Sequence, residues 1–115
     1  MRKAYFLSSC DTCKRILKEL PVDANFDLQD LKEKPITEEE LQILFAHSKS
    51  YAQLINKRAK LYRDQDLKNK TLTESDCKAL LLSHYTFLKR PVFRIDDKIF
   101  IGNSKKTIQE VHQAL

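Results

Sequence analysis

The beginning of the chain places two cysteines between a short apolar segment and an amphipathic helix. Residues 3–7 form a short segment rich in apolar and aromatic side chains and predict a buried strand, and two serines and the pair Cys10 and Cys13 follow it. Apolar side chains then recur at helical spacing until Pro21, which ends the predicted helix. These side chains are Cys13, Ile16, Leu17 and Leu20. Both cysteines are therefore expected at a strand-to-helix turn, with Cys10 at the start of the helix.

Three further segments have the patterns of strands. Residues 22–28 alternate apolar and polar side chains, as Val22, Ala24, Phe26 and Leu28 show. Residues 92–95 and 98–101 predict a hairpin that turns at Asp96-Asp97. The first two strands can form a parallel unit through the helix between them, and the last two pair antiparallel. The sequence thus predicts an α/β fold: a mixed four-stranded, thioredoxin-like (glutaredoxin-like) sheet, with helices on both faces and a helical insertion between its halves.

The middle and the end of the chain carry helix start signals. Thr37 with Glu40 and Thr73 with Asp76 can each form a capping box, and Ser104 can cap a last helix. A further short helix is predicted around residues 51–55. The side chains expected on the buried faces are Leu41, Leu44, Phe45, Tyr51, Leu54, Ile55, Cys77, Leu80, Leu81, Ile108, Val111 and Leu115.

Length and composition restrict the class of protein. With 115 residues, 42% hydrophobic and 32% charged, residues 1–115 are expected to form a single domain. No apolar run approaches the roughly 20 residues of a membrane span, and residues 4–7 are too short for a secretory signal, so a cytoplasmic protein is expected. The net charge of +5 is spread along the chain, which favours solvated helix faces over direct nucleic-acid binding. A single glycine, Gly102, excludes phosphate-binding loops and dinucleotide-binding turns.

The cysteine pair admits four interpretations. Three cysteines in a cytoplasmic chain fit a structural disulfide framework poorly. A zinc site needs about four ligands, and Cys77 and the histidines supply no second closely spaced pair, so no metal is expected. Buried, inert thiols are plausible for Cys77 and in part for Cys13. Cys10, which precedes the apolar stripe, best fits the fourth interpretation, a redox thiol.

Physical chemistry gives a thiol at the position of Cys10 its reactivity. Unpaired N–H groups and the helix dipole at a helix N-terminus stabilise thiolate over thiol. Lys14 and Arg15 add to this effect, and Asp11 opposes it. Cys13, one turn later, can attack a mixed disulfide on Cys10, as two-step thiol exchange requires.

The sequence resembles the ArsC/Spx family of thioredoxin-fold proteins over nearly its whole length. The matching segments are residues 10–15, residues 35–41, Leu54–Arg58 with Tyr62, His84 placed six residues before Arg90-Pro91, and residues 92–102. The resemblance implies that Cys10 is the nucleophile that attacks an oxyanion. It also implies that Arg90 binds the anion and that Pro91 corresponds to the cis-proline of thioredoxin folds.

Some positions depart from the arsenate reductases of this family. Asn56 stands where they have an anion-binding arginine, and Gly102-Asn103 stands where they have another. Arg58, or Arg15, is the candidate to supply a missing charge, because guanidinium groups suit a tetrahedral oxyanion. His84 shares a face with apolar residues and is expected to be a hydrogen-bonded, partly buried structural histidine.

Two functions from different classes follow from the resemblance. The first is a thiol-disulfide oxidoreductase, an arsenate reductase, in which Cys13 resolves the adduct on Cys10. It would act on a small oxyanion or thiol/disulfide substrate, hold no tightly bound cofactor, and use external glutathione/glutaredoxin or thioredoxin as reductant. The alternative is an Spx-like redox-sensing transcription regulator that binds RNA polymerase. The cysteine pair favours this alternative, whereas the absence of glycine from residues 46–50 disfavours it.

Overall fold

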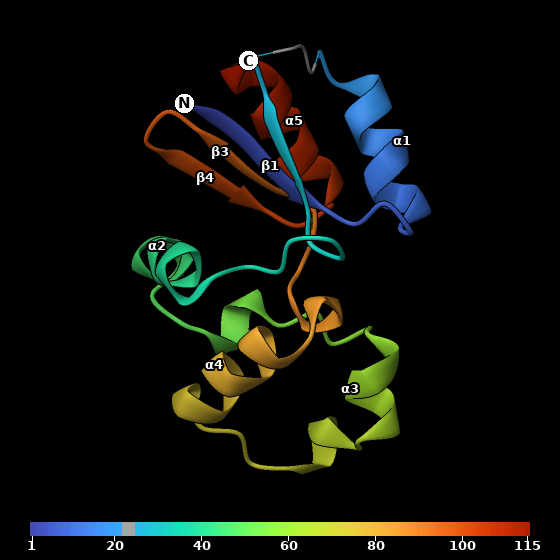
Figure 1. The fold of residues 1–115 in the computed structure, drawn as a ribbon, viewed down its shortest axis with the longest axis vertical. Coiled ribbons are helices and arrows are strands. Elements are labelled where there is room, and N and C mark those ends of the chain that lie inside the picture. The colour runs from blue at the N-terminus through green and yellow to red at the C-terminus, as the bar shows by residue number, and fades with distance from the viewer. Residues whose placement is uncertain (22–24) are drawn as a thin grey trace. The chain divides into compact units, whose positions relative to one another are not determined.

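The computed structural model describes residues 1–21 and 25–115, with strands and helices at both ends of the chain and helices in the middle (Figure 1). The strands are β1 (Arg2–Phe6), β2 (Asp27–Asp30), β3 (Val92–Ile95) and β4 (Lys98–Ile101). The helices are α1 (Asp11–Glu19), α2 (Glu38–Ser48), α3 (Lys60–Asp64), α4 (Glu74–Ser83) and α5 (Lys105–Ala114). Single-turn 3₁₀ helices lie at Ala52–Leu54, Leu67–Asn69 and Tyr85–Phe87. Within the described residues, no helix is long and apolar enough to cross a membrane.

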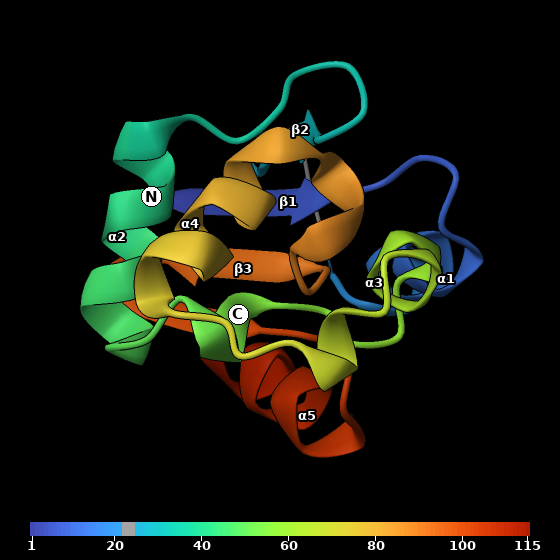
Figure 2. The same cartoon turned by 90° about the horizontal axis from the view of Figure 1, so that it is seen from below.

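The strands form one mixed sheet in the order β2-β1-β3-β4, and Figure 2 shows β1 between β2 and β3. β1 pairs parallel with β2 and antiparallel with β3, and β3 and β4 form the antiparallel hairpin. In this register Phe6 lies opposite Asp30, and Ala4 lies opposite Phe93. The predicted thioredoxin-like topology is confirmed, and the bounds of the hairpin strands are those expected from the sequence.

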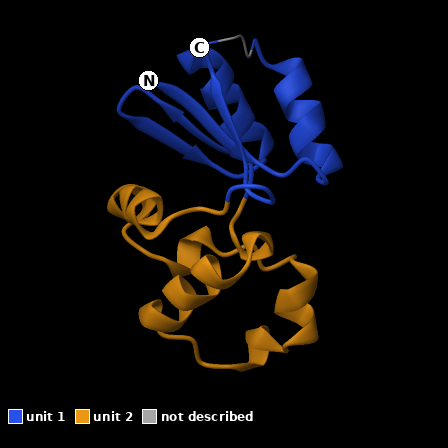
Figure 3. Ribbon diagram, in the orientation of Figure 1, with its two compact units in different colours: residues 1–34, 90–115 blue, residues 35–89 orange. Residues whose placement is uncertain are grey.

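The chain divides into two compact units (Figure 3). Unit 1 comprises Met1–Lys34 and Arg90–Leu115, and it contains the sheet with α1 and α5. Unit 2, Pro35–Lys89, is the predicted helical insertion between β2 and β3. The expectation that residues 1–115 behave as a single domain stays a prediction.

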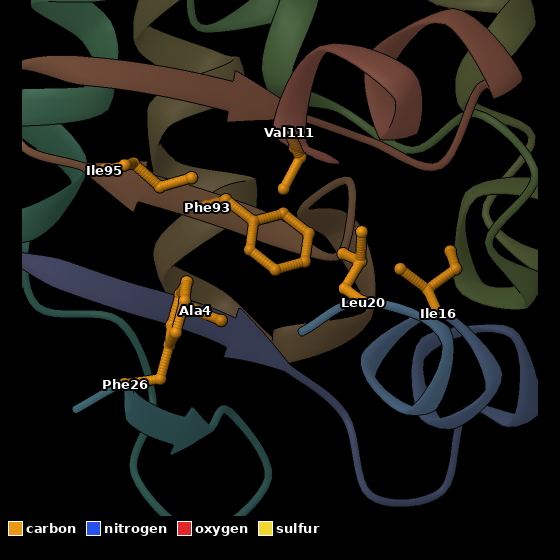
Figure 4. Packing of buried hydrophobic residues seen from close by; sticks show 7 residues of the cluster. All are labelled: Ala4, Ile16, Leu20, Phe26, Phe93, Ile95 and Val111. Atoms are coloured by element: carbon orange, nitrogen blue, oxygen red, sulfur yellow. The ribbon is translucent and has the colours of Figure 1, made fainter. Parts of the chain in front are cut away.

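In unit 1, α1 and α5 pack against the same face of the sheet (Figure 4). Ala4 on β1 and Phe93 on β3 lie opposite each other in the sheet and belong to this cluster. The rings of Phe26 and Phe93 pack edge to face, with 6.3 Å between their centroids. The buried members are Ala4, Ile16, Leu20, Phe26, Phe93, Ile95 and Val111. Each large side chain buried here contributes about 1.5–3 kcal/mol relative to exposure. The core thereby fixes α1, which contains Cys13, and with it the end of the loop that carries Cys10.

Unit 2 is held by buried side chains, by an isolated antiparallel bridge between Ile55 and Leu88, and by helix caps and side-chain bonds to the backbone. Both capping boxes form as predicted: Thr37 with Glu40 at α2, and Thr73 with Asp76 at α4. The Glu74 carboxylate accepts two further backbone N–H bonds, from residues 51 (2.8 Å) and 52 (3.1 Å), at the start of the 3₁₀ turn there. The helices bury Leu41, Leu44, Tyr62, Cys77 and Leu81, among others.

The second strand differs from its prediction. β2 begins at Asp27, not at residue 22, and Val22 and Ala24 lie outside the described residues. Phe26 is buried but precedes the strand, whereas Leu28, expected to face inward, is 45% exposed. Because strand side chains alternate, the outward Leu28 places its neighbour Gln29 inward. Pairing with β1 sets this register.

Candidate active site

The loop after β1 presents Cys10 at the N-terminus of α1. The Cys10 N–H donates to the Leu7 carbonyl at 3.0 Å, and the Cys10 carbonyl accepts from Lys14 at 3.1 Å, so a turn leads directly into the helix. Cys10 is the N-cap residue, and its Sγ accepts the backbone N–H of Cys13 at 3.5 Å. A thiol thus occupies the position where a hydroxyl or carboxylate usually caps a helix.

The environment of Cys10 favours its thiolate. Partial burial raises the pKa of the Cys10 thiol, but the N–H and thiol of Cys13 and the Arg90 guanidinium lower it more, so the net pKa is below its ordinary value. The side chain is half-buried and remains accessible. A lowered pKa, access to solvent and a nearby cation are the properties of a reactive cysteine.

Cys13 has the opposite character. Its side chain has no exposed surface, and burial is the main reason that its pKa rises to about 12. The Cys10 thiol beside it also raises the pKa of Cys13, while the backbone N–H of Leu7 and the charge of Arg90 lower it. Both thiols are free, and their surroundings shift their pKa values in opposite directions, downward for Cys10 and upward for Cys13.

Arg90 and Pro91 complete the group that unit 1 brings together. Arg90 is half-buried and close enough for its charge to lower the pKa of Cys10. The Arg90–Pro91 peptide bond is cis, as the resemblance implied, and Pro91 is fully buried. The Pro91 carbonyl accepts the N–H of Gly102 at 3.0 Å, and Gly102 has the left-handed φ of 95° that favours glycine.

The other arginines are placed differently. Arg58 is an exposed residue of unit 2, and its backbone N–H donates to the Asn56 side chain at 3.1 Å. Its predicted contact with an anion stays a prediction. Arg15 lies 4.0 Å from Glu19 on the exposed surface of α1, and Lys14 lies 3.6 Å from Asp11. These pairs are typical of solvated charges, which contribute little to stability.

Asp30 is a residue of the site that the sequence did not suggest. As the last residue of β2, it accepts the Ser8 N–H at 3.2 Å and the Lys32 N–H at 3.1 Å, both on Oδ1. Burial raises the pKa of Asp30, but the Ser8 hydroxyl and the two N–H groups lower it more. The available signal in the sequence was a polar residue at the end of the second strand, which pairs with the strand that precedes Cys10. Because the predicted second strand ended at residue 28, this signal was missed.

Two residues were expected to have structural roles, and their surroundings confirm this. Cys77 is 2% exposed on α4, and burial, followed by the charges of Glu74 and Asp76, raises its pKa, while Lys57 lowers it. His84 is half-buried, its Nδ1 accepts the Thr86 N–H at 3.0 Å, and its ring lies 4.2 Å from the ring of the next residue. In the described part of the chain, no three His, Cys, Asp or Glu side chains gather as a metal site requires.

The mixed sheet, the cysteine pair at the first strand-to-helix turn and the cis-proline before β3 define a thioredoxin-like protein. A model of the ArsC family matches residues 5–111, and the chain therefore belongs to the ArsC family.

Solved structures share this fold over nearly the whole chain. A Staphylococcus aureus protein is 31% identical, and the match covers 96% of this chain and 97% of that protein with a TM-score of 0.72. A protein named YffB is 23% identical, and the match covers 100% of this chain and 99% of that protein with a TM-score of 0.79. An arsenate reductase from Vibrio cholerae is 16% identical, and the match covers 99% of this chain and 97% of that protein with a TM-score of 0.77. No curated protein matches the chain.

Family membership supports a thiol-dependent oxidoreductase, because proteins of the ArsC family act on oxyanion substrates with thiol reductants.

Proposed function

We propose that this protein is an arsenate reductase in which Cys10 is the nucleophile and Cys13 the resolving thiol. The observation that carries the proposal is the position of Cys10 Sγ, which caps α1 at 3.5 Å from the Cys13 N–H with the Arg90 charge beside it. A thiolate at a helix N-terminus next to a guanidinium suits attack on an oxyanion, since the same groups stabilise both anions.

In the first step the Cys10 thiolate attacks the arsenic(V) atom of arsenate. A hydroxyl of arsenate takes up a proton and leaves as water, and a sulfur–arsenic bond forms. Arg90 binds the oxyanion and stabilises its negative charge, and we expect Arg58 to add a second positive charge. Pro91 contributes backbone to the substrate-binding surface beside Arg90.

In the second step Cys13 resolves the adduct. Its thiolate attacks Cys10 Sγ, the sulfur–arsenic bond breaks, and its electron pair remains on arsenic, which leaves as arsenite in the +III state. The two thiols are oxidised to a Cys10–Cys13 disulfide, so the electrons balance. Burial is the largest cause of the raised pKa of Cys13, and the negative charge of Cys10 is a further cause. Formation of the adduct removes the charge of Cys10, so the pKa of Cys13 falls in this step, while the effect of burial remains.

An external thiol system then reduces the disulfide, and no tightly bound cofactor takes part. Glutathione with glutaredoxin, or thioredoxin, would supply the electrons. The buried position of Cys13 means that the reductant has to attack the sulfur of Cys10, which is the more accessible one.

A redox-sensing regulator of the Spx type is the second candidate function. The pairing of an accessible, low-pKa Cys10 with a buried Cys13 also suits a thiol switch, whose disulfide would change binding to RNA polymerase. The glycine that such regulators carry near the polymerase-binding surface is absent from residues 46–50.

The deciding experiment supplies the purified protein with NADPH, arsenate and either glutathione/glutaredoxin or thioredoxin. Arsenate-dependent NADPH oxidation that disappears in Cys10→Ser supports the reductase. The Cys13→Ser variant should form the adduct yet turn over slowly, unless glutathione replaces the resolving thiol. Absence of turnover with both reductants, together with specific binding to purified RNA polymerase, would reject the reductase in favour of the regulator.

A further inference from the structure

Asp30 lies at the carboxyl end of the edge strand β2, next to the start of the loop that leads from β1 to Cys10. It is the last residue of β2 and stands opposite Phe6, the last residue of the parallel strand β1. The Leu31 N–H donates to the Phe6 carbonyl at 2.8 Å, so the ends of the two strands are joined at this point. Polar groups at the carboxyl ends of parallel strands are commonly used for function in α/β proteins.

One oxygen of Asp30 joins two separate chain segments. Oδ1 accepts the N–H of Ser8, two residues before Cys10, and also the N–H of Lys32, two residues after Asp30 itself. The turn that follows is closed by the Cys10 N–H on the Leu7 carbonyl at 3.0 Å. The stretch from residue 7 to residue 10 is therefore held by one bond across the sheet and one bond within the turn.

The contact that stabilises the Cys10 thiolate is sensitive to the position of this loop. Cys10 Sγ and the Cys13 nitrogen are 3.5 Å apart, which is long enough that a small outward shift of Cys10 would weaken the bond. A shift would also change the separation of Cys10 from the Arg90 charge. The nucleophile thus depends on whatever fixes residues 8–10.

We propose that Asp30 is a positioning residue for the nucleophile, acting through its hydrogen bond to the Ser8 backbone. Asp30 holds the Ser8–Cys10 loop so that Cys10 Sγ stays over the N-terminus of α1. This inference rests on the proposed role of Cys10, but it concerns the reactivity of the thiol and not the identity of the substrate.

The hydrogen bond and the charge of Asp30 act on the thiolate in opposite directions. If the bond to Ser8 matters, removing it raises the pKa of Cys10, because the loop relaxes and the Cys13 N–H moves away. If only the negative charge matters, removing it lowers the pKa of Cys10, because repulsion of the thiolate is lost.

The test measures iodoacetamide alkylation of Cys10 against pH, resolved by peptide mass spectrometry so that Cys13 and Cys77 do not contribute. Asp30→Ala removes the acceptor, and Asp30→Asn removes the charge but keeps an acceptor oxygen. Asp27→Ala is the matched control, because Asp27 is in the same strand and pairs with Lys3 at 3.4 Å, away from the loop.

We expect Asp30→Ala to slow alkylation at pH 6 by roughly fivefold, as a pKa rise of somewhat under one unit would. Asp30→Asn and Asp27→Ala should stay close to the wild type. Where Asp30→Ala does not fold, Asp30→Ser serves instead, because it also removes the carboxylate oxygen that accepts the Ser8 N–H.

An unchanged or faster reaction in Asp30→Ala, or equal loss in Asp30→Ala and Asp30→Asn, would overturn the role of Asp30. These outcomes differ from a failure of the proposed function. If the wild-type Cys10 itself titrates with an ordinary thiol pKa, the reductase mechanism fails, whatever the Asp30 variants do.

Discussion

The two units of this protein each contain cysteine, and the comparison shows what makes a thiol reactive. In unit 1, Cys10 caps a helix, is half-buried and has a lowered pKa. In unit 2, Cys77 lies within a helix, is 2% exposed and has a raised pKa, because burial and two neighbouring carboxylates disfavour its thiolate. The side chains are identical, so position on the helix, access to solvent and the neighbouring charges account for the difference.

The units also differ in how their backbone is secured. Unit 1 joins distant segments through its sheet, so residue 30 of one strand can hold a loop that follows another. Unit 2, in which residues 35–89 are all described, has no strand of the sheet and combines local helix caps with an isolated antiparallel bridge between Ile55 and Leu88, where the Lys89 N–H donates to the Leu54 carbonyl at 2.9 Å. The Lys78–Glu38 ion pair at 2.7 Å and the Glu74 carboxylate add longer-range side-chain links.

The largest expected effect concerns the two cysteines themselves. Cys10→Ser should reduce arsenate-dependent activity by roughly 10³-fold or more, because a serine hydroxyl is not ionised at neutral pH and is a far weaker nucleophile. Cys77→Ala should leave activity within about twofold, since its thiol stays protonated and takes no part in the proposed chemistry. Steady-state NADPH oxidation measures both, and comparable losses would contradict the assignment of the chemistry to unit 1.

The next effect compares the two cores. Phe93→Ala in unit 1 and Phe87→Ala in unit 2 each remove a ring that is at most 1% exposed, and each should lower the free energy of unfolding by about 3–5 kcal/mol. If residues 1–115 form a single domain, both variants shift one common transition. Urea unfolding followed by far-ultraviolet circular dichroism and tyrosine fluorescence measures this. Two separated transitions, each moved by only one variant, would show that the units unfold independently.

A smaller effect separates the two arginines. Arg90→Ala should raise the pKa of Cys10, since its positive charge now lowers it, and should slow alkylation of Cys10 at pH 6 roughly threefold. The acidic limb of the pH–rate profile should therefore move to higher pH. Arg58→Ala is expected to leave the thiol pKa unchanged and to raise the KM for arsenate. A shift of the thiol profile in Arg58→Ala equal to that in Arg90→Ala would contradict this division of roles.

The smallest effects concern helix caps. Thr73→Ala in unit 2 and Ser104→Ala in unit 1 each remove a side-chain acceptor at a helix N-terminus and should cost about 1 kcal/mol. The cap at Thr73 has an additional dependence on pH, because its N–H and hydroxyl lower the pKa of Asp76. Its contribution is thus present above the ordinary carboxylate pKa and is lost as pH falls through the lower folded value.

Thermal unfolding of the wild type and both variants at neutral pH and at about pH 3 measures the caps. The destabilisation by Thr73→Ala should shrink at the acidic pH. The destabilisation by Ser104→Ala, whose cap contains no carboxylate, should persist. Equal behaviour of the two variants with pH would contradict the role of Asp76.

The sequence predicted the elements whose signals are local. The hairpin at residues 92–101, both capping boxes and the placement of Cys10 at the start of α1 were all predicted and are all confirmed. It did not predict α3, whose five residues bury only Tyr62 and carry no capping side chain, so that no periodic pattern marks it.

The sequence by itself determined that a thiol would stand at a helix N-terminus with a second thiol one turn later. That follows from the spacing of Cys10 and Cys13 within a helical stripe, and spacing along a helix is a local property. Only the tertiary structure decided where β2 begins and which backbone groups Asp30 binds. Strand register depends on pairing with a partner elsewhere in the chain, and the bond from Ser8 to Asp30 spans 22 positions in the sequence. Such contacts exist only once the sheet has formed, and for this reason a local pattern could not show them.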